Sequence, residues 1–322
     1  MNILVTGASG FIGQALCREL IHTKKIQLVF VTSRSLHPEG YFPYPIRTVD
    51  VTSLSDLNER HDILSQIDCI VHLAARVHQM RDTTTDPLGA FRLINTQATC
   101  DLALAAAKHN VRRFIYLSSI KVNGEQTNPG KPFTPEDIPD PRDPYGLSKA
   151  EAEIQLRQIS ARTGLEVIII RPPLVYGPGV KANFLSMMKW LNRGIPLPLG
   201  AISNRRSLVA LPNLVDLIIT CLSHPDAANQ TFLVSDNEDL STTELLKRMA
   251  KALGKTPRLL PIPASWLVFT ASILGKESIA RRLCSSLQVD IHKTQTLLNW
   301  KPPVTVDYAL KLTANHFISG PK

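Results

Sequence analysis

The chain has 322 residues, of which 44% are hydrophobic and 20% are charged. This length and balance are typical of one large or two modest globular domains, and they exclude a fibrous or natively unfolded chain. The net charge is +9, but Lys and Arg are spread along the chain rather than gathered into a run, so we expect an anionic small molecule as partner and no nucleic acid.

The sequence lacks the usual marks of membrane, secreted and metal-binding proteins. No apolar stretch reaches the ~18 residues of a membrane span, and the best candidates are Leu165–Ile170 and Ala264–Gly275. Because the chain begins on a predicted strand without a charged-then-apolar leader, we expect a cytoplasmic protein. The five cysteines and nine histidines show no metal-ligand spacing, so we expect reduced thiols and no metal.

Short β-branched apolar runs alternate with helical patterns in the first half of the chain. Continuous runs of this kind are typical of strands buried on both faces of a parallel sheet. With helices expected over Ile12–Ile21, Ala90–Lys108 and Tyr145–Gln158, the order predicts an α/β fold with a doubly wound parallel (Rossmann) sheet. The predicted strands are Ile3–Val5, Leu28–Val31, Cys69–Leu73, Phe114–Leu117 and Val167–Ile170.

The second half of the chain has a looser pattern. After Tyr176–Gly179 come helices and short apolar pieces, and a proline-rich loop is expected earlier, over Asn128–Tyr145. We therefore predict a sheet domain over residues 1–175 and a smaller, mainly helical C-terminal lobe over residues 176–322. Strands within about residues 205–235 are expected to return to the sheet domain.

Three glycines follow the first predicted strand. They lie in the stretch Gly7–Gly13, which leads directly into the predicted helix Ile12–Ile21. Glycine permits a tight turn and a close approach of a ligand, and the start of a helix presents N–H groups and a positive dipole end to an anion. In this strand-turn-helix context the spacing predicts a dinucleotide pyrophosphate site formed by Gly7, Gly10, Phe11, Ile12 and Gly13.

The second predicted strand ends without a carboxylate. In sites that prefer NAD, an acid at this place accepts hydrogen bonds from the adenosine ribose. This chain has Ser33 and Arg34 instead, and a hydroxyl followed by a guanidinium suits a 2′-phosphate. We therefore predict NADP(H) as the preferred cofactor and NAD(H) as the alternative, which holds if Arg34 is only a solvated loop residue.

A Tyr/Lys pair and a serine that follows a predicted strand are the candidate catalytic residues. Tyr145 and Lys149 lie one turn apart on one helix, and Ser119 follows Phe114–Leu117, at the edge where open α/β sheets bind ligands. A neighbouring ammonium lowers the pKa of a phenol from ~10, so we expect Tyr145 to pass a proton at neutral pH. Ser119 would bond the same substrate oxygen while a nicotinamide exchanges hydride with its carbon. We predict these three residues as catalytic.

Together these motifs resemble the extended short-chain dehydrogenase/reductase family, in its nucleotide-sugar epimerase and reductase branch. The resemblance covers nearly the whole chain and includes Arg171–Gly179 and Leu298–Pro302. By this resemblance, Lys149 also contacts the nicotinamide ribose. Further implied cofactor residues are Asp50, Val51, Leu73, Ala74, Ala75, Asn95, Ser118, Tyr145 and Pro172.

The resemblance also implies a UDP-sugar substrate and a homodimer. Members of the family pair through two long helices, here Ala90–Lys108 and Tyr145–Ile159, which would form a four-helix interface. A nucleotide-diphosphate site is implied in the C-terminal lobe. The implied substrate residues are Ser119, Asn183, Leu197, Pro198 and Arg206.

Departures from the family patterns narrow the activity. Members that dehydrate sugar nucleotides carry an acidic pair after the position of Ser119, where this chain has Ile120–Lys121. Isoleucine cannot act as an acid and lysine has the opposite charge, so we do not expect a dehydratase. The segment Ser118–Glu125 resembles enzymes that act on UDP-4-keto-6-deoxy-N-acetylhexosamines.

Reductase and epimerase activities remain rivals, since both exchange a hydride at C4. Many 4-epimerases carry tyrosine where Asn123 stands and asparagine where Leu174 stands. The missing acid at the end of the second predicted strand and the NADP(H) preference favour the reductase, because epimerases of the family characteristically hold NAD. We therefore predict a 4-keto-6-deoxy sugar 4-reductase of surface polysaccharide biosynthesis, with a UDP-hexose or UDP-N-acetylhexosamine 4-epimerase as the alternative. A non-catalytic dinucleotide-binding regulator is disfavoured because Ser119, Tyr145 and Lys149 are all present.

One apolar segment of the C-terminal half is open to two interpretations. Trp266–Leu274 is followed by the pair Arg281 and Arg282. A core helix with a solvated basic end is the favoured interpretation. A contact with a membrane surface or a partner is the alternative.

Overall fold

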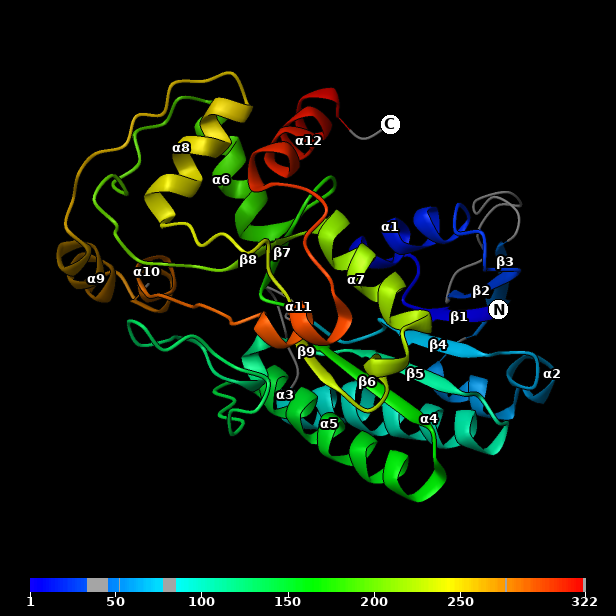
Figure 1. The fold of residues 1–322 in the computed structure, drawn as a ribbon. Helices are drawn as coiled ribbons and strands as arrows, with labels where there is room; N and C mark the ends of the chain where they lie inside the picture. The colour runs from blue at the N-terminus through cyan, green and yellow to red at the C-terminus, as the bar shows by residue number, and fades with distance from the viewer. Residues whose placement is uncertain (34–45, 52, 78–84, 276, 321–322) are drawn as a thin grey trace.

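Seven parallel strands form the central sheet, in the order β3-β2-β1-β4-β5-β6-β9 (Figure 1). The computed structural model describes residues 1–33, 46–51, 53–77, 85–275 and 277–320. The doubly wound parallel sheet predicted from the sequence is confirmed. The strands are β1 (Asn2–Thr6), β2 (Leu28–Ser33), β3 (Ile46–Asp50), β4 (Cys69–His72), β5 (Arg113–Leu117), β6 (Glu166–Arg171) and β9 (Thr231–Leu233).

Helices cover both faces of this sheet (Figure 1). One buried cluster joins the strands to α1 (Phe11–Leu20), α7 (Leu211–Ser223) and α11 (His292–Leu298). A second cluster on the opposite face joins them to α2 (His61–Leu64), α4 (Ala98–Lys108) and α5 (Pro144–Thr163). Because both faces are packed, the central strands β4, β5 and β6 are almost fully buried, as their continuous apolar runs indicate.

Helix α5 has a strong start and a strong end. Asp143 caps its N-terminus by accepting a hydrogen bond from Gly146 N at 2.7 Å, and Pro144 occupies the first turn, where its missing N–H costs nothing. Gly164, with φ of 78°, ends it in the left-handed conformation. These signals fix the position of the residues that α5 carries at its start.

The long helix expected over Ala90–Lys108 is a composite. It begins earlier, at α3 (Pro87–Phe91), continues through a π-helical stretch over Arg92–Gln97, and ends as α4. Single π-helical turns often occur at functional sites, because they re-aim a side chain. Here the stretch contains Asn95, which is fully buried against the sheet edge.

The smaller lobe is mainly helical. It contains the strand pair β7 (Leu174–Tyr176) and β8 (Leu208–Ala210), and a third buried cluster joins them to the lobe's helices. Figure 1 shows α6, α8 and α12 together at one end of the molecule. The helices are α6 (Ala182–Asn192), α8 (Thr242–Ala252), α9 (Ala264–Ile273), α10 (Glu277–Cys284) and α12 (Val306–Ser319).

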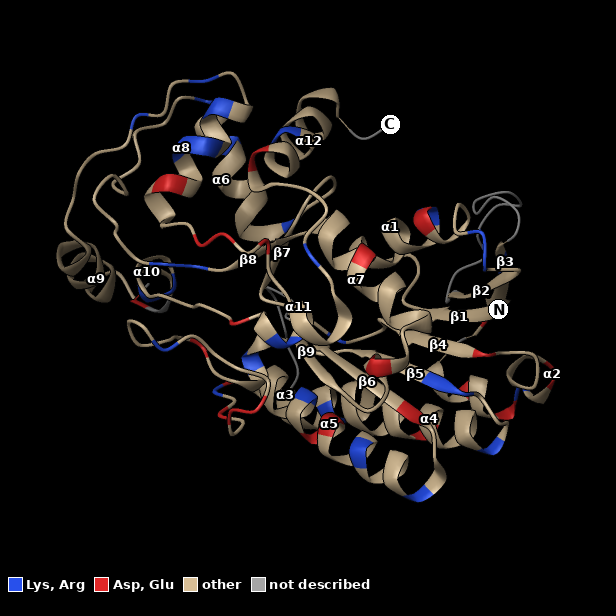
Figure 2. Cartoon of the chain, in the orientation of Figure 1, with Lys and Arg blue, Asp and Glu red and all other residues tan. Residues whose placement is uncertain are grey.

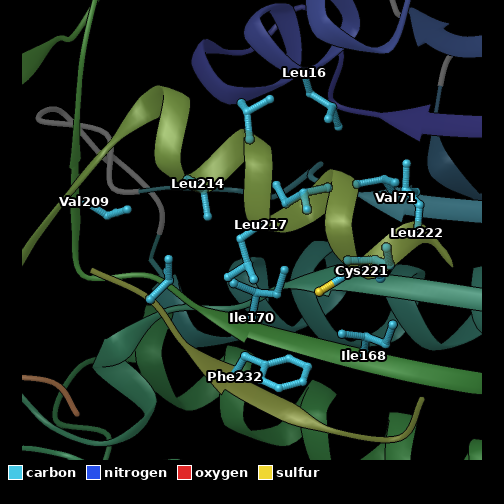
Figure 3. Close-up of a cluster of buried hydrophobic side chains, with 14 of the residues drawn as sticks. Leu16, Val71, Ile168, Ile170, Val209, Leu214, Leu217, Cys221, Leu222 and Phe232 are labelled. Atoms are coloured by element: carbon cyan, nitrogen blue, oxygen red, sulfur yellow. The ribbon is translucent and has the colours of Figure 1, made fainter. Parts of the chain in front are cut away.

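Between β8 and α8, which belong to the lobe, the chain returns to the central sheet and forms α7 and β9. Strand β9 pairs in parallel with β6, and α7 packs on the face that α1 also covers. Figure 3 shows Leu217 and Cys221 of α7 near Ile168 and Ile170 of β6, with Phe232 of β9 beside them. The buried side chains of residues 211–233 therefore belong to the core that α1 and α7 form with the sheet, and not to the core of the lobe.

The edge strand β3 lacks the continuous apolar run that marks the central strands. Ile46–Asp50 pairs with β2 at the edge of the sheet, with Ser33 beside Asp50. Three of its five residues are exposed, so its sequence has no continuous apolar run. No helix in the described ranges combines the length and apolar character needed to cross a membrane.

Candidate active site

Two glycines, one in the turn after β1 and one in the first turns of α1, have no room for a side chain. Gly7 has φ of 72°, and a Cβ there would lie 2.7 Å from Ala74 N. A Cβ on Gly13 would collide with the carbonyl oxygen of Gly7. Gly10 N donates to Gly7 O at 2.9 Å and closes the turn. Glycine is therefore required for β1, α1 and the segment after β4 to approach one another this closely.

The start of α1 suits an anion. Gly10 is its N-cap, no side chain caps it, and its first turn contains no acidic residue. The first backbone N–H groups of a helix carry the positive end of the dipole, so they bind phosphate groups well. The turn and the helix start thus fit a dinucleotide pyrophosphate, and Phe11 and Ile12 form the first turn of α1, packed partly against the core.

The other predicted cofactor residues lie along the same carboxyl edge of the sheet. Leu73, Ala74 and Ala75 follow β4, and Ala74 N donates to Thr6 Oγ1 at 3.2 Å. Asn95 Oδ1 accepts from Arg76 N at 2.8 Å, which ties the π-helical stretch to this segment.

At the adenosine end, Asp50 ends β3 beside Ser33 of β2, and Val51 follows it as a buried residue. The side chain of Ser33 and the whole of Arg34 lie outside the described residues. The structure therefore places the strand ends but does not describe the pair on which the predicted NADP(H) preference depends.

Ser119, Tyr145 and Lys149 meet at the end of β5. A side-chain hydrogen bond joins Tyr145 to Ser119. Lys149 Nζ donates to Leu117 O at 2.9 Å and lies 4.5 Å from the ring centroid of Tyr116. The serine, the phenol and the amine predicted as catalytic are thus together, and Pro172 is close by because its carbonyl accepts from Ile120 N at 3.0 Å.

The charges at this site differ from the sequence prediction. Burial raises the pKa of Tyr145 to about 12, although its hydrogen bond with Ser119 opposes the shift. Burial also lowers the pKa of Lys149 to about 7, against an opposing effect of the Glu153 carboxylate. The expectation that Lys149 lowers the pKa of Tyr145 below its ordinary value is therefore wrong here, because burial disfavours both charged forms.

A buried ion pair supports the helix that carries Tyr145 and Lys149. Arg171 donates to both oxygens of Glu153, at 2.9 and 2.6 Å, and both side chains are at most 2% exposed. Ser118 Oγ also donates to Glu153, at 2.6 Å. Sequence analysis missed this pair, although Glu153 follows Lys149 by four residues and so shares its helix face.

Lys121 holds the start of the same helix. Its ammonium forms an ion pair with Asp143, the N-cap of α5. It thus stands where dehydratase-like sequences carry an acid, and it is engaged with a structural carboxylate.

The predicted substrate residues of the lobe lie on separate segments. Asn183 is exposed at the start of α6, and Pro198 is exposed on the loop after that helix. Leu197 is buried in the lobe's core, and its N–H donates to Arg258 O at 2.9 Å. Arg206 Nη1 donates to the carbonyls of Arg282 and Ser285, at 2.8 and 2.9 Å.

This combination of a doubly wound sheet, a glycine turn at its first strand and a Ser, Tyr and Lys group at its edge defines a dinucleotide-dependent enzyme of the short-chain dehydrogenase/reductase type. The profile of the NAD dependent epimerase/dehydratase family matches residues 3–235. The chain belongs to this family. No group of three or more His, Cys, Asp or Glu side chains in the described part of the chain is arranged to hold a metal ion.

Two relatives that match almost the whole chain are named as 4-epimerases. A UDP-glucose 4-epimerase of Vibrio cholerae is 44% identical over 320 residues, which cover 99% of this chain and 96% of the relative. An Escherichia coli O157:H7 protein named N-acetyl-alpha-D-glucosaminyl-diphospho-ditrans,octacis-undecaprenol 4-epimerase is 27% identical, with coverage of 98% and 95%. Among solved structures, UDP-glucose 4-epimerase of Thermotoga maritima with UDP-glucose superposes with a TM-score of 0.78 at 23% identity, covering 99% of both chains.

Proposed function

We propose that this protein is a 4-epimerase of a UDP-linked hexose or N-acetylhexosamine. The observation that carries the proposal is its 44% identity, over 99% of the chain, to the Vibrio cholerae UDP-glucose 4-epimerase. The Escherichia coli relative also carries a 4-epimerase name, for a sugar attached through a diphosphate. Sequence analysis had ranked a reductase first and an epimerase second, and these relatives favour the reverse order.

The side chains at the end of β5 suit proton transfer at a sugar hydroxyl. The glycine turn and the start of α1 would hold a nicotinamide cofactor, which when bound would supply reversible hydride transfer at C4 of the sugar. Ser119 bonds the C4 oxygen, and Tyr145, hydrogen-bonded to Ser119, takes up the proton of that oxygen and later gives it back. Lys149 lies one turn along α5, and burial lowers the pKa of its amine to about 7, so it would supply a positive charge that favours the phenolate only in its protonated form.

The remaining site assignments belong to the same proposal. The dinucleotide is bound by Gly7, Gly10 and Gly13, and by the carboxyl ends of the strands together with Asn95. The UDP portion is contacted by Asn183, Pro198 and Arg206. Leu197 is the weakest of the substrate assignments because its side chain is buried in the core of the lobe. Each assignment predicts a change in cofactor or UDP-sugar affinity on substitution.

A homodimer through α4 and α5 is a further part of the proposal. Leu104 of α4 and Ile154 of α5 are half exposed on these two neighbouring helices. Pairing of two copies there would cover both side chains in a four-helix contact. Replacing both by Glu should convert a dimer to a monomer in light scattering, and a wild-type monomer would contradict this part.

A 4-keto-6-deoxy sugar reductase is the second candidate. The observation that favours it is the sequence at the end of β2, where Ser33 and Arg34 replace the acid expected for NAD and suit NADP(H). A reductase must release its oxidised cofactor in every cycle, whereas an epimerase regenerates it on the enzyme.

The two candidates separate in one assay. The purified protein is incubated with UDP-glucose or UDP-N-acetylglucosamine and either oxidised cofactor, and in parallel with a UDP-4-keto-6-deoxy sugar and either reduced cofactor. The products are followed by proton NMR and the cofactor by its absorbance. Appearance of the C4 epimer without net change in nicotinamide absorbance supports the epimerase. Consumption of NADPH or NADH only with the UDP-4-keto-6-deoxy sugar, and no epimer, supports the reductase.

A further inference from the structure

Helix α9 is apolar on all sides, yet none of its residues is buried. A helix of this composition is normally found in a protein core. Here Trp266 is 66% exposed and Phe269 is 64% exposed, and Ile273 and Leu274 are exposed still further. The core helix favoured by sequence analysis is therefore wrong.

The helix has two distinct faces. Ala264 and Leu267 pack partly against the buried cluster of the lobe. Trp266, Phe269 and Ile273 follow one another at intervals of three and four residues, which places them together on the outward face. The inward face packs α9 against the lobe. The outward face is mostly exposed and contributes little to the core of the lobe.

The chain around α9 is strongly basic. From Leu245 to Lys276 the sequence contains no Asp or Glu, and in α10 the carboxylate of Glu277 pairs with Arg281. Figure 2 shows α9 itself uncharged, at the outer edge of the lobe, with α10 beside it. The cations of this stretch are Lys247, Lys251, Lys255, Arg258 and Lys276, together with Arg248, which pairs with Glu238 and Asp307, and α10 adds Arg281 and Arg282.

We propose that α9 and α10 bind the surface of an anionic membrane, with the outward face of α9 among the lipid headgroups. Trp, Phe and aliphatic side chains bordered by Lys and Arg are the composition of helices that lie in a membrane interface. The charge decides between occupants. A second copy of this chain would bring the same cations against each other, whereas anionic lipid is complementary.

The docking surface also connects with the proposed substrate site. Arg206, assigned to the sugar nucleotide, donates to the carbonyl of Arg282 at the end of α10. Membrane contact through α10 would therefore hold the lobe's substrate side close to the bilayer. The docking itself does not depend on the proposed activity, and its test measures binding alone.

Flotation with lipid vesicles tests the proposal. The full chain is mixed with phosphatidylcholine vesicles, with or without phosphatidylglycerol, at low and high salt. We expect it to float with the anionic vesicles, to float less at high salt, and to stay unbound with phosphatidylcholine alone. In a Trp190→Phe background, which leaves Trp266 and the buried Trp300, the tryptophan emission should shift to the blue on binding.

Matched variants separate the surface from general stickiness. The double variant Trp266→Ser/Phe269→Ser should bind anionic vesicles about tenfold or more weakly. Its control, Tyr308→Ser/Ile318→Ser, removes one exposed aromatic and one exposed aliphatic side chain from α12 and should float like the wild type. Thermal melting by circular dichroism confirms that both variants are folded.

Charge variants complete the test. Arg281→Glu/Arg282→Glu should weaken binding about tenfold, and Lys24→Glu/Lys25→Glu, which makes the same charge change at two exposed sites after α1, should have a smaller effect. The proposal is overturned if the wild type ignores anionic vesicles or if the α9 double variant floats equally well. Self-association that is lost in the α9 variant, without vesicle binding, would likewise overturn it and assign the face to a second copy.

Discussion

Two regions of the molecule depart from the usual distribution of side chains. The sheet edge behind Tyr145 buries charged side chains, and the outer edge of the lobe exposes large aromatic ones. At the sheet edge, the charged side chains of Lys149, Glu153 and Arg171 are almost fully buried. At α9, Trp266 and Phe269 are largely exposed. Charged groups are normally outside and large aromatic groups inside, so both placements cost stability. Such departures are expected at functional sites. We therefore assign the buried charges to the candidate active site and the exposed aromatic side chains of α9 to a surface that contacts its surroundings.

The largest effect is expected at Tyr145. Replacing it by Phe removes the hydroxyl that is bonded to Ser119 and should lower turnover about 10²–10⁴-fold while cofactor binding is retained. Steady-state kinetics and cofactor titration measure the two quantities. Tyr308→Phe, on the exposed side of α12, is the control and should keep full turnover. Equal activity of both variants would remove the phenol from the chemistry.

The buried ion pair gives the next largest effect. Arg171→Met leaves the Glu153 carboxylate buried without its main partner and should lower the free energy of unfolding by about 3–5 kcal/mol. Arg157 also contacts Glu153, at 3.1 Å, but its side chain is 46% exposed, so Arg157→Met should cost less than about 1 kcal/mol. Urea unfolding compares the two. Similar losses would show that burial does not distinguish these contacts.

Lys149 should reveal the cost of a buried amine. Since burial lowers its pKa to about 7 from 10.5, Lys149→Met should raise the free energy of unfolding near neutral pH by roughly 1–3 kcal/mol, after the loss of the bond to Leu117 O. Between pH 7 and 10.5 the unfolded chain holds a proton that the folded chain has released. Wild-type stability therefore rises with pH in this range, and the advantage of Met should shrink. Melting at several pH values checks this, and a constant gap would contradict it.

The smallest effects separate the two faces of α9. Leu267→Ala on the inward face should cost about 1 kcal/mol because this side chain packs against the lobe's core. Phe269→Ser on the outward face should change the free energy of unfolding by no more than about 0.5 kcal/mol. Chemical unfolding measures both. A larger loss for Phe269→Ser would show that the outward face stabilises the fold.

Where the sequence carried short-range signals, the fold and the site could be predicted. Continuous apolar runs located β1, β2, β4, β5 and β6, because strands buried on both faces need them. The glycine turn and the Tyr/Lys helix could be located because their spacing is fixed by local geometry.

Features set by tertiary contacts could not be predicted. The edge strand β3 is largely exposed, so it shows no apolar run. Glu153 and Arg171 lie on different elements, 18 residues apart in the sequence, and a charged residue gives no sign of burial by itself. The pKa values of Tyr145 and Lys149 depend on how deeply the fold buries them, and α9 looked like a core helix because composition does not reveal what covers it.

The path of the hydride is the most direct test of the central claim, that this sheet edge epimerises a UDP-hexose at C4. UDP-glucose deuterated at C4 is incubated with the purified protein and NAD⁺ or NADP⁺, and the product is examined by NMR and mass spectrometry, with Tyr145→Phe as the inactive control. We predict a C4 epimer that retains the deuterium at C4. A product with the label at another carbon or lost to solvent, or no epimer from any UDP-hexose or UDP-N-acetylhexosamine tested, would contradict the account.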